Sequence, residues 1–477
     1  MEAAGDPPDM PLRDKAFYGC AFFLLGVFLF SIFKSIGIVL LAASAGSAYF
    51  LASGERYRIW MMPVMLIGAF YFNICGLVRD SIFIPYGADA LVSGIVVNAT
   101  HKSASQELIL ELSDPYNGKI KIYAKAYPRM NYGSKAAVSG PIERIPDEQA
   151  DFFIKEGIYG ISKFPDITLI ETGQGNLIIG YLAGLRGRII GIFNRALPPE
   201  KAALIAGMTI GAKEGFSKEF KDKMSISGTT HIVALSGYNI SIISLNVLAI
   251  LALFLTRSAS FYITVAVISL FVLMTGAEAS AVRAAIMGIL ALFAKERERQ
   301  FSMKNAIIFA ATGMVLVNPR VLVFDLGFQL SFAALLGIVY FLPVLQKIFR
   351  FEKSGFFSWR ENALTTISAQ LAVVPLLLGK FGTVSLTSIF ANILILGAVP
   401  LTMGLGFIIA LSGLASEFLA GAIALPAGLL LGYELLVIDV FSKFALPIAS
   451  DFFNLGTSLA YYLILGGIVL YNSENEK

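Results

Sequence analysis

The sequence has very few of the side chains on which soluble proteins build metal centres and disulfide frameworks. Only two cysteines, Cys20 and Cys75, and two histidines, His101 and His231, occur in 477 residues. Both cysteines lie in apolar stretches, so neither a disulfide framework nor a cysteine-rich metal site is expected. Two histidines also exclude a hydrolase centre built from several histidines. We therefore predict no metal and no cofactor.

Charged residues are also scarce. They make up 15% of the chain, whereas hydrophobic residues make up 56% and the mean hydropathy is +0.74. Soluble domains are about one-quarter charged, so this composition predicts a polytopic α-helical membrane protein. The formal net charge of +4 is too small to indicate a partner.

The motifs of nucleotide-driven and hydrolytic enzymes are missing. The Gly-Lys pairs at 118–119 and 379–380 lack the rest of a phosphate-binding loop, and neither His-Glu-x-x-His nor Gly-x-Ser-x-Gly occurs. We therefore predict that the chain is not an enzyme and does not hydrolyse nucleotide. A driving force for transport must then come from a gradient or a partner protein.

Apolar runs open the chain. Two basic residues precede a run over residues 16–33, and a second run follows directly at 36–51. Because the second run comes so soon, the first is predicted to be an uncleaved signal anchor rather than a signal peptide. With a third run at 59–78, residues 1–83 are predicted to form about three transmembrane helices.

The pattern changes between residues 84 and 176. Apolar and polar residues alternate there, for example in Glu107–Leu112 and Lys119–Lys125, which is typical of half-buried strands. The turn Pro115–Gly118 ends in Asn-Gly and predicts a hairpin between these two strands. Several short strands in so short a segment predict a small all-β domain resembling an OB-fold, inserted after the third transmembrane helix.

Residues 177–230 are predicted to form an amphipathic connecting segment. Gly184, Arg188, Gly191 and Arg195 recur at helical spacing on one face, which is typical of a helix in the membrane interface.

Residues 231–477 are again apolar and are predicted to form a transmembrane channel domain. Pro400 lies inside the longest run and is expected to kink or divide it. The predicted spans are 232–255, 260–275, 279–294, 304–317, 326–345, 363–379, 385–411, 415–436 and 456–471.

The distribution of basic loops predicts the orientation. If every run crosses the bilayer, the basic loops fall on one side, which is the cytoplasmic side by the positive-inside rule. The β domain then lies outside the cytoplasm. These loops contain Arg13 and Lys15, Arg56 and Arg58, Arg257, residues 295–299 and residues 347–360.

Polar side chains recur at four places within or beside the apolar spans. A bilayer offers them no water, so they must meet another helix or a wet passage. We predict that they line one water-accessible conduit. The candidate lining residues are His231, Ser236, Gly237 and Asn239 in the first cluster, Ser280 and Arg283 in the second, Asp325, Gln329 and Ser331 in the third, and Gln370 and Asn392 in the fourth.

A second interpretation of these residues stays open. Hydroxyl and amide side chains in membrane helices often serve only as hydrogen-bond partners between helices, each worth roughly 1 kcal/mol. Arg283 needs a cavity or a carboxylate, for which Glu278 and Asp325 are candidates, unless it extends to the interface. His231 stands at the mouth of its span, as an interfacial anchor or a proton relay.

Five motifs occur in one order along the membrane part of the chain. Residues 231–239 read His-Ile-Val-Ala-Leu-Ser-Gly-Tyr-Asn, and residues 280–284 read Ser-Ala-Val-Arg-Ala. Asn318-Pro319 and the Gly-Phe-Gln-Leu-Ser-Phe stretch at 327–332 follow, and then a series from Ala369-Gln370 to Asn392. Over about residues 200–410 this order resembles the ComEC family of competence proteins, whose first signature is His-Leu-Leu-Ala-x-Ser-Gly-Leu-His.

The resemblance implies a multi-pass channel in the bacterial inner membrane that passes single-stranded DNA into the cytoplasm during natural transformation. The transported DNA and membrane lipid are the implied partners, with a DNA receptor, a cytoplasmic motor ATPase and a separate nuclease as candidates. Two departures are visible. Asn239 replaces the second signature histidine, and the 477 residues include no metallo-β-lactamase-like domain, so we expect a short form with nuclease activity absent or supplied by another protein.

Two other functions remain open at this point. One is a secondary transporter or flippase for a small molecule or lipid, and the other is a membrane scaffold for a separate motor or nuclease. Residues 81–180 carry nine Lys and Arg against eleven Asp and Glu, so the β domain is not a basic patch overall. The closely spaced Lys119, Lys121 and Lys125 are expected to form a solvated face rather than a nucleic-acid groove.

Overall fold

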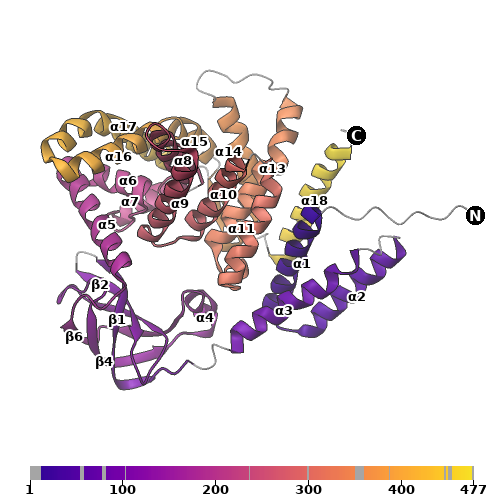
Figure 1. Ribbon diagram of the computed structural model, residues 1–477, viewed down its shortest axis with the longest axis horizontal. Helices are drawn as coiled ribbons and strands as arrows, with labels where there is room; N and C mark the ends of the chain where they lie inside the picture. Colours follow the sequence, from indigo (N-terminus) through magenta and orange to yellow (C-terminus); the bar gives the residue numbers. More distant parts are fainter. Residues whose placement is uncertain are drawn as a thin grey trace, which may run out of the picture.

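The computed structural model describes residues 12–53, 58–77, 82–101, 104–235, 237–297, 300–349, 359–385, 387–444, 447–449 and 454–474. It is mostly helical, and a small β domain lies against one end of the helices (Figure 1). This agrees with the predicted helical membrane protein that carries a small β domain.

Helices occupy the three predicted N-terminal runs: α1 (Leu12–Phe33), α2 (Ile36–Ala52) and α3 (Met61–Leu77). In Figure 1 they lie on the opposite side of the molecule from α16 and α17. Gly26 and Gly68 allow α1 and α3 to cross closely. A Cβ at Gly68, for example, would lie 2.2 Å from the carbonyl oxygen of Phe23.

The β domain contains six strands that form one sheet. They are β1 (Gly87–His101), β2 (Ser105–Leu112), β3 (Lys119–Lys125), β4 (Lys135–Arg144), β5 (Ile158–Lys163) and β6 (Asp166–Glu171). Five of them close into a ring. β1 pairs with both β2 and β4, and β2 pairs with β3. β5 closes the ring, because it pairs with β3 in parallel and with β4 in antiparallel orientation. β6 adds to the outside edge of β4.

The interior of this ring is built from alternate residues of each strand. In β2 and β3 every second side chain is buried, and Leu110, Ile120 and Ile122 are fully enclosed. The predicted hairpin is confirmed, because β2 and β3 pair through the turn at 113–118. Gly118 adopts a φ of +97°, which a side chain at this position would oppose.

Four helices connect the β domain with the later apolar part of the chain. α4 (Asp147–Ile154) lies between β4 and β5 and faces the membrane helices in Figure 1. α5 (Leu177–Ala196) begins at Asn176, whose side chain accepts hydrogen bonds from the amides of Ile178 and Ile179. α6 (Pro199–Ile210) and α7 (Lys218–Ile226) follow.

The remaining helices form the bulk of the molecule. They are α8 (Gly237–Leu251), α9 (Arg257–Met274), α10 (Ala279–Glu296), α11 (Met303–Val317), α12 (Val321–Phe324), α13 (Leu326–Phe349), α14 (Trp359–Phe381), α15 (Ser388–Leu396), α16 (Val399–Ala415), α17 (Glu417–Lys443) and α18 (Leu455–Glu474). A two-stranded sheet of β7 (Thr383–Ser385) and β8 (Pro447–Ala449) joins the ends of α14 and α17.

Within the described ranges, six helices are long and apolar enough to cross a membrane, and α15 with α16 makes a seventh if the bent pair is one span. The chain is therefore a multi-pass membrane protein. α5, which was predicted to lie in the interface, is one of the six. The predicted break at Pro400 is confirmed, because α15 and α16 meet at a bend of 52°.

The start of the predicted span 232–255 differs from the prediction. Residues 230–232 form a single 3₁₀ turn, and the α-helix begins only at Gly237. The carbonyl oxygen of Leu235 instead accepts a hydrogen bond from the Ser280 hydroxyl at 2.6 Å, so a contact from another helix replaces one helical turn.

Candidate functional site

A large cavity lies between the β domain and the membrane helices. Its volume is about 2660 Å³, and its walls include residues of β1, β2 and β3, the segment from Met224 to Ser241, the start of α10, and α13, α14 and α15. We call it the central cavity. Elements that are far apart in the sequence therefore meet around one space.

The wall formed by α14 follows nearly the whole helix. Its lining residues recur every three or four positions, which is the spacing of one helical face. At 1.5 Å per residue, the first and last of them lie about 28 Å apart along the helix, close to the roughly 30 Å thickness of a bilayer core. These residues are Asn362, Thr365, Thr366, Ala369, Gln370, Val373, Val374, Leu377 and Phe381.

α13 forms the neighbouring wall in the same way. Gly327, Leu330, Ser331 and Ala334 lie on its cavity face. Gly337 lies on the face toward α14, where an added Cβ would be 2.5 Å from the carbonyl oxygen of Ser368. This glycine therefore lets the two helices pack closely beside the central cavity.

Most of the predicted conduit residues line this one cavity. They are His231, Gly237, Asn239, Ser280, Arg283, Asp325, Ser331, Gln370 and Asn392. Gln329 is not among the lining residues, and Ser236 lies outside the described residues. The structure thus brings the four clusters together, while their role in transport stays a prediction.

Some lining residues also hold helices together. The Asn239 side chain donates a hydrogen bond to the carbonyl oxygen of Met208 in α6 at 3.1 Å. The Ser280 hydroxyl donates to the carbonyl of Leu235, as described above. The two interpretations of these polar residues are therefore not exclusive, because one side chain can join two helices and face the cavity.

Arg283 of α10 is a buried cation in the wall of the central cavity. Its side chain is 8% exposed, and its guanidinium carbon lies 5.7 Å from the centre of the Phe332 ring, within the range of a cation–π contact. Its buried Nε has no hydrogen-bond partner in the part of the chain that the structure describes. The guanidinium therefore lies against a ring, and its buried Nε keeps an unused donor in the cavity wall.

Neither predicted carboxylate pairs with Arg283. Glu278 binds Lys213 at 2.7 Å, and Asp325 binds Lys155 at 2.8 Å. That prediction is wrong because lysines from other elements bind both carboxylates. These lysines come from the α6–α7 segment and from the turn after α4.

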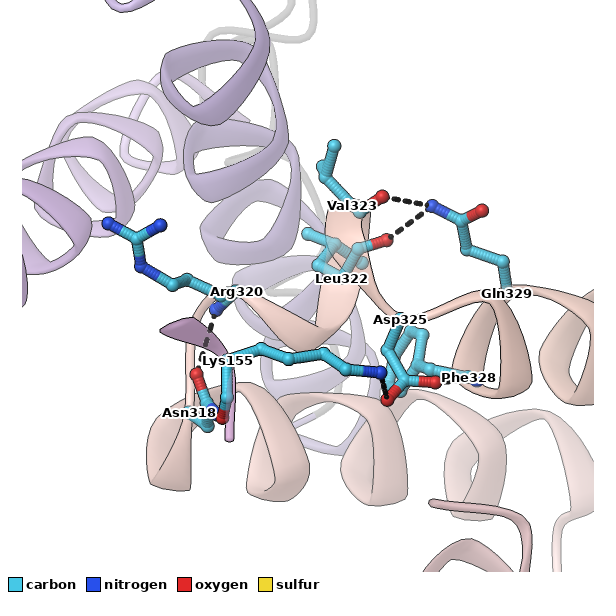
Figure 2. A network of polar contacts seen from close by, with 8 residues as sticks. All are labelled: Lys155, Asn318, Arg320, Leu322, Val323, Asp325, Phe328 and Gln329. Atoms are coloured by element: carbon cyan, nitrogen blue, oxygen red, sulfur yellow. Dashed lines mark hydrogen bonds and ion pairs between the residues drawn. The ribbon is translucent and has the colours of Figure 1, made fainter. Parts of the chain in front are cut away.

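Figure 2 shows how the turn between α11 and α13 contacts Lys155, the residue that follows α4. Lys155 reaches across to Asp325, and the backbone carbonyl of Lys155 accepts a hydrogen bond from the Asn318 side chain at 2.7 Å. Arg320 forms an ion pair with Asp151 of α4. We call these contacts the α4 clamp. They join the β domain to the membrane helices beside the opening of the central cavity.

Gln329 belongs to this turn rather than to the cavity wall. Its side-chain amide donates hydrogen bonds to the carbonyl oxygens of Val323 at 2.6 Å and Leu322 at 3.3 Å (Figure 2). These carbonyls lie in the short helix α12, where helix ends leave such groups without intrahelical partners. Gln329 therefore stabilises the turn.

The fourth cluster forms a polar wall between α14 and α15. The Gln370 amide donates a hydrogen bond to the Ser388 hydroxyl, which in turn donates to the carbonyl oxygen of Ser385 at 2.7 Å. Asn392 is 3% exposed, and its Oδ1 is buried without a hydrogen-bond partner in the described ranges. This wall therefore contains an acceptor that no described group satisfies.

The lysines of β3 divide between two roles. Lys119 lines the central cavity, whereas Lys121 binds Glu107 of the neighbouring strand at 3.1 Å. Burial is the largest single effect and lowers the pKa of Lys121, but the hydrogen bond and charge of Glu107 together with Tyr123 outweigh it, so the pKa of the lysine is raised. Lys121 therefore stays charged, and its charge is balanced by Glu107.

The sequence analysis missed the lysines at the cavity opening, Lys155 and Lys213, because both lie in short polar turns between elements. It also missed the polar residues at the start of α14, Asn362, Thr365 and Thr366. Their positions continue in steps of three and one to Ala369 and Gln370, so the sequence pattern could have predicted that they share one helix face with Gln370. Across the described ranges, no group of three or more His, Cys, Asp or Glu is arranged to hold a metal ion.

Comparison with known proteins gives two matches in this region. The family model described as "Competence protein" matches residues 208–475. The "ComE operon protein 3" of Bacillus subtilis (strain 168) is 28% identical over 211 residues, which is 44% of this chain and 26% of the relative. The chain thus matches about a quarter of the length of that relative. No solved structure matches the chain significantly.

The family match covers the segment in which the polar clusters lie. It includes α8 and all later helices, and hence the α13, α14 and α15 walls of the central cavity. Because residues 208–475 are more than half of the sequence, the chain belongs to the competence protein family, the ComEC family that its motifs resemble.

Proposed function

We propose that this chain is the channel through which single-stranded DNA crosses the bacterial inner membrane into the cytoplasm during natural transformation. Membership of the competence protein family and similarity to a ComE operon protein support a role in DNA uptake. The observation that carries the proposal is the central cavity, whose lining follows α14 for about 28 Å and is polar or small from Asn362 to Gln370.

The size of the cavity favours a polymer over a small molecule. Pockets for small molecules usually have volumes of about 300–1,000 Å³, whereas the central cavity, which is partly open, has a volume of about 2660 Å³. A flippase or small-molecule transporter would need only part of this space. We therefore place that function second, and a purely structural scaffold third.

The charges of the cavity suit a moving polyanion. A strand that passes through must not be trapped, and each phosphate neutralised by a cation strengthens binding. Of the cations that line the cavity, Lys155 and Lys213 are each paired with a carboxylate, Lys119 and Lys221 lie on β3 and α7, and Arg283 is the one that is buried in α10. One buried guanidinium can contact a phosphate in passing without building a basic trap.

We infer that the β domain is an OB-like barrel outside the cytoplasm that frames the outer opening. Its closed ring of five strands and the pairing of β1 with both β2 and β4 support an OB-like barrel. The loop charges support the outside placement. Asn98, Glu111 and Lys119 line the cavity, so an incoming strand would meet the barrel before the helices.

The proposal gives the residues of this chain no catalytic step. Strand degradation, DNA capture and ATP hydrolysis are assigned to partner proteins: a separate nuclease, a DNA receptor and a cytoplasmic motor ATPase. This assignment agrees with the missing nucleotide-binding and hydrolase motifs in the 477 residues.

Fluorescent DNA uptake into cells that lack the chain, restored with designed variants, tests the proposal. Ala334→Trp places a large ring in the cavity, whereas Leu336→Trp, on the same helix, replaces a side chain that is 41% exposed on the outer surface. We expect Ala334→Trp to abolish entry of DNA into the cytoplasm while DNA still collects outside the inner membrane. Leu336→Trp at equal protein level should restore entry, and entry in the deleted cells would overturn the proposal.

A further inference from the structure

A buried carboxylate lies behind the wall of the central cavity. Glu434 is only 1% exposed and stands nine residues before the end of α17, which is one of the helices long enough to cross a membrane. Acidic residues inside such helices are costly and usually serve ion or proton pathways. Glu434 is not among the residues of the cavity wall, so the proposed channel does not account for it.

The surroundings of Glu434 do not suit a negative charge. The Thr402 hydroxyl of α16 donates a hydrogen bond to Oε1 at 2.8 Å, and Oε2 is buried without a partner among the described residues. An ionised carboxylate accepts at about four positions, and here one donor is present. A neutral, protonated carboxyl group is therefore the form that fits this site.

The charged groups on the neighbouring helices are engaged elsewhere. Lys201 of α6 donates a hydrogen bond to the carbonyl oxygen of Gly428, one and a half turns before Glu434 on α17. Lys223 of α7 binds Glu219 and Asp439. In the described ranges, no lysine or arginine lies within ion-pair distance of Glu434, so a proton is the available means of neutralising it.

Glu434 is connected to the cavity through the bend between α15 and α16. Thr402 lies 3.2 Å from the carbonyl oxygen of Ala398, the residue at the bend. On either side of Ala398, Gly397 and Val399 line the central cavity. One hydroxyl thus contacts both the buried carboxyl group and the broken segment of the cavity wall.

We propose that Glu434 is a proton-binding site that couples protonation to the shape of the α15–α16 bend. When the carboxyl group gives its proton to water, the resulting charge competes for the Thr402 hydroxyl and draws in water or further donors. The bend, which Thr402 holds, then shifts and changes the cavity wall. The proton site stands by itself, whereas its use to drive DNA entry rests on the proposed function.

Infrared difference spectroscopy of the full chain in lipid nanodiscs tests the proton site. We expect a carbonyl stretching band of a protonated carboxyl group that disappears at alkaline pH and is missing in Glu434→Gln. Asp439→Asn is the matched control, because this carboxylate on the same helix is paired with Lys223 and Lys443, and the band should persist there. A band that survives Glu434→Gln overturns the site.

Two further measurements sharpen the result. Thr402→Val removes the donor to Glu434 at nearly constant volume and should move the band to higher wavenumber, so an unchanged band contradicts the described geometry. Loss of the band on adding sodium at constant pH would identify a sodium site and overturn the proton assignment.

DNA uptake tests the coupling separately. Glu434→Gln should lower cytoplasmic entry at least tenfold and remove its dependence on external pH, while Asp439→Asn should keep both. If the infrared band belongs to Glu434 but uptake by Glu434→Gln is normal, the coupling is overturned and the proton site stands. If wild-type protein does not restore uptake at all, the proposed function fails, and the infrared result still decides the site.

Discussion

The central cavity and the turn between α11 and α13 both contain polar residues within an apolar sequence, but they differ in how far the polar atoms are hydrogen-bonded. At the turn, Gln329 and Asp325 direct their side chains to backbone carbonyls, a backbone amide and a lysine. In the cavity wall, Arg283 and Asn392 keep buried atoms that no described group satisfies. Satisfied polar groups hold the fold, whereas the cavity wall retains buried atoms whose hydrogen-bonding capacity is unused.

Removal of the Arg283 side chain from the cavity wall should have the largest effect. Arg283→Ala is expected to lower DNA uptake about 100-fold, because a lost charge-assisted contact is worth roughly 2–3 kcal/mol. Thermal stability should fall as well, because the buried side chain and its contact with the Phe332 ring are lost. Uptake assays and thermal unfolding of the purified variant measure both, and normal uptake at a normal protein level would remove Arg283 from the mechanism.

Disruption of the α4 clamp should have the next largest effect. Asp325→Asn leaves Lys155 without its carboxylate in a half-buried site and should destabilise the docking of α4 by about 1–3 kcal/mol. The exchange Lys155→Asp with Asp325→Lys should recover part of that loss, which a double-mutant cycle measures. If the single change has no effect on stability and the exchange is no better, the pair does not hold the β domain.

Gln329→Ala should act on stability alone. It removes the donor to the carbonyls of Leu322 and Val323, which is expected to cost about 1 kcal/mol. Uptake per folded molecule, from fluorescent DNA divided by membrane protein level, should stay normal. A large loss of uptake without a loss of protein would show that Gln329 takes part in transport and does not only stabilise the turn.

The smallest effect is expected at the start of α14. Thr365→Val keeps the volume and removes one hydroxyl from the cavity wall, so uptake should fall less than about threefold, as expected for one uncharged hydrogen bond. Competitive uptake of the variant and the wild type in mixed culture resolves such a difference. A hundredfold loss would mean that this end of α14 recognises the strand specifically.

The apolar runs and alternating strands were sufficient to predict most elements. The three N-terminal helices, the hairpin of β2 and β3 and the bend near Pro400 follow from local patterns, and the structure contains all of them. Local patterns decide these elements because helix and strand periodicity depend on neighbouring residues. The start of α8 was missed because a contact from Ser280, which lies far away in sequence, replaces its first turn.

The ion-pair partners of residues far apart in the sequence could not be predicted for the same reason. Arg283 was expected to pair with Glu278 or Asp325, both near it in the order of the motifs. Lysines in two polar turns reach these carboxylates first, and nothing in a single sequence marks those turns as neighbours. The convergence of four clusters on one cavity was a prediction about space, and the lining residues support it for all described members except Gln329.

Cysteine accessibility along α14 tests the central claim most directly. The chain contains only Cys20 and Cys75, so a cysteine-free background with single cysteines from position 362 to 381 is practical. A water-soluble maleimide applied to protein in membranes should label positions 365, 369, 373 and 377, and leave 364, 368 and 372 unlabelled. A helix whose middle positions all resist the reagent would contradict a water-accessible passage along α14.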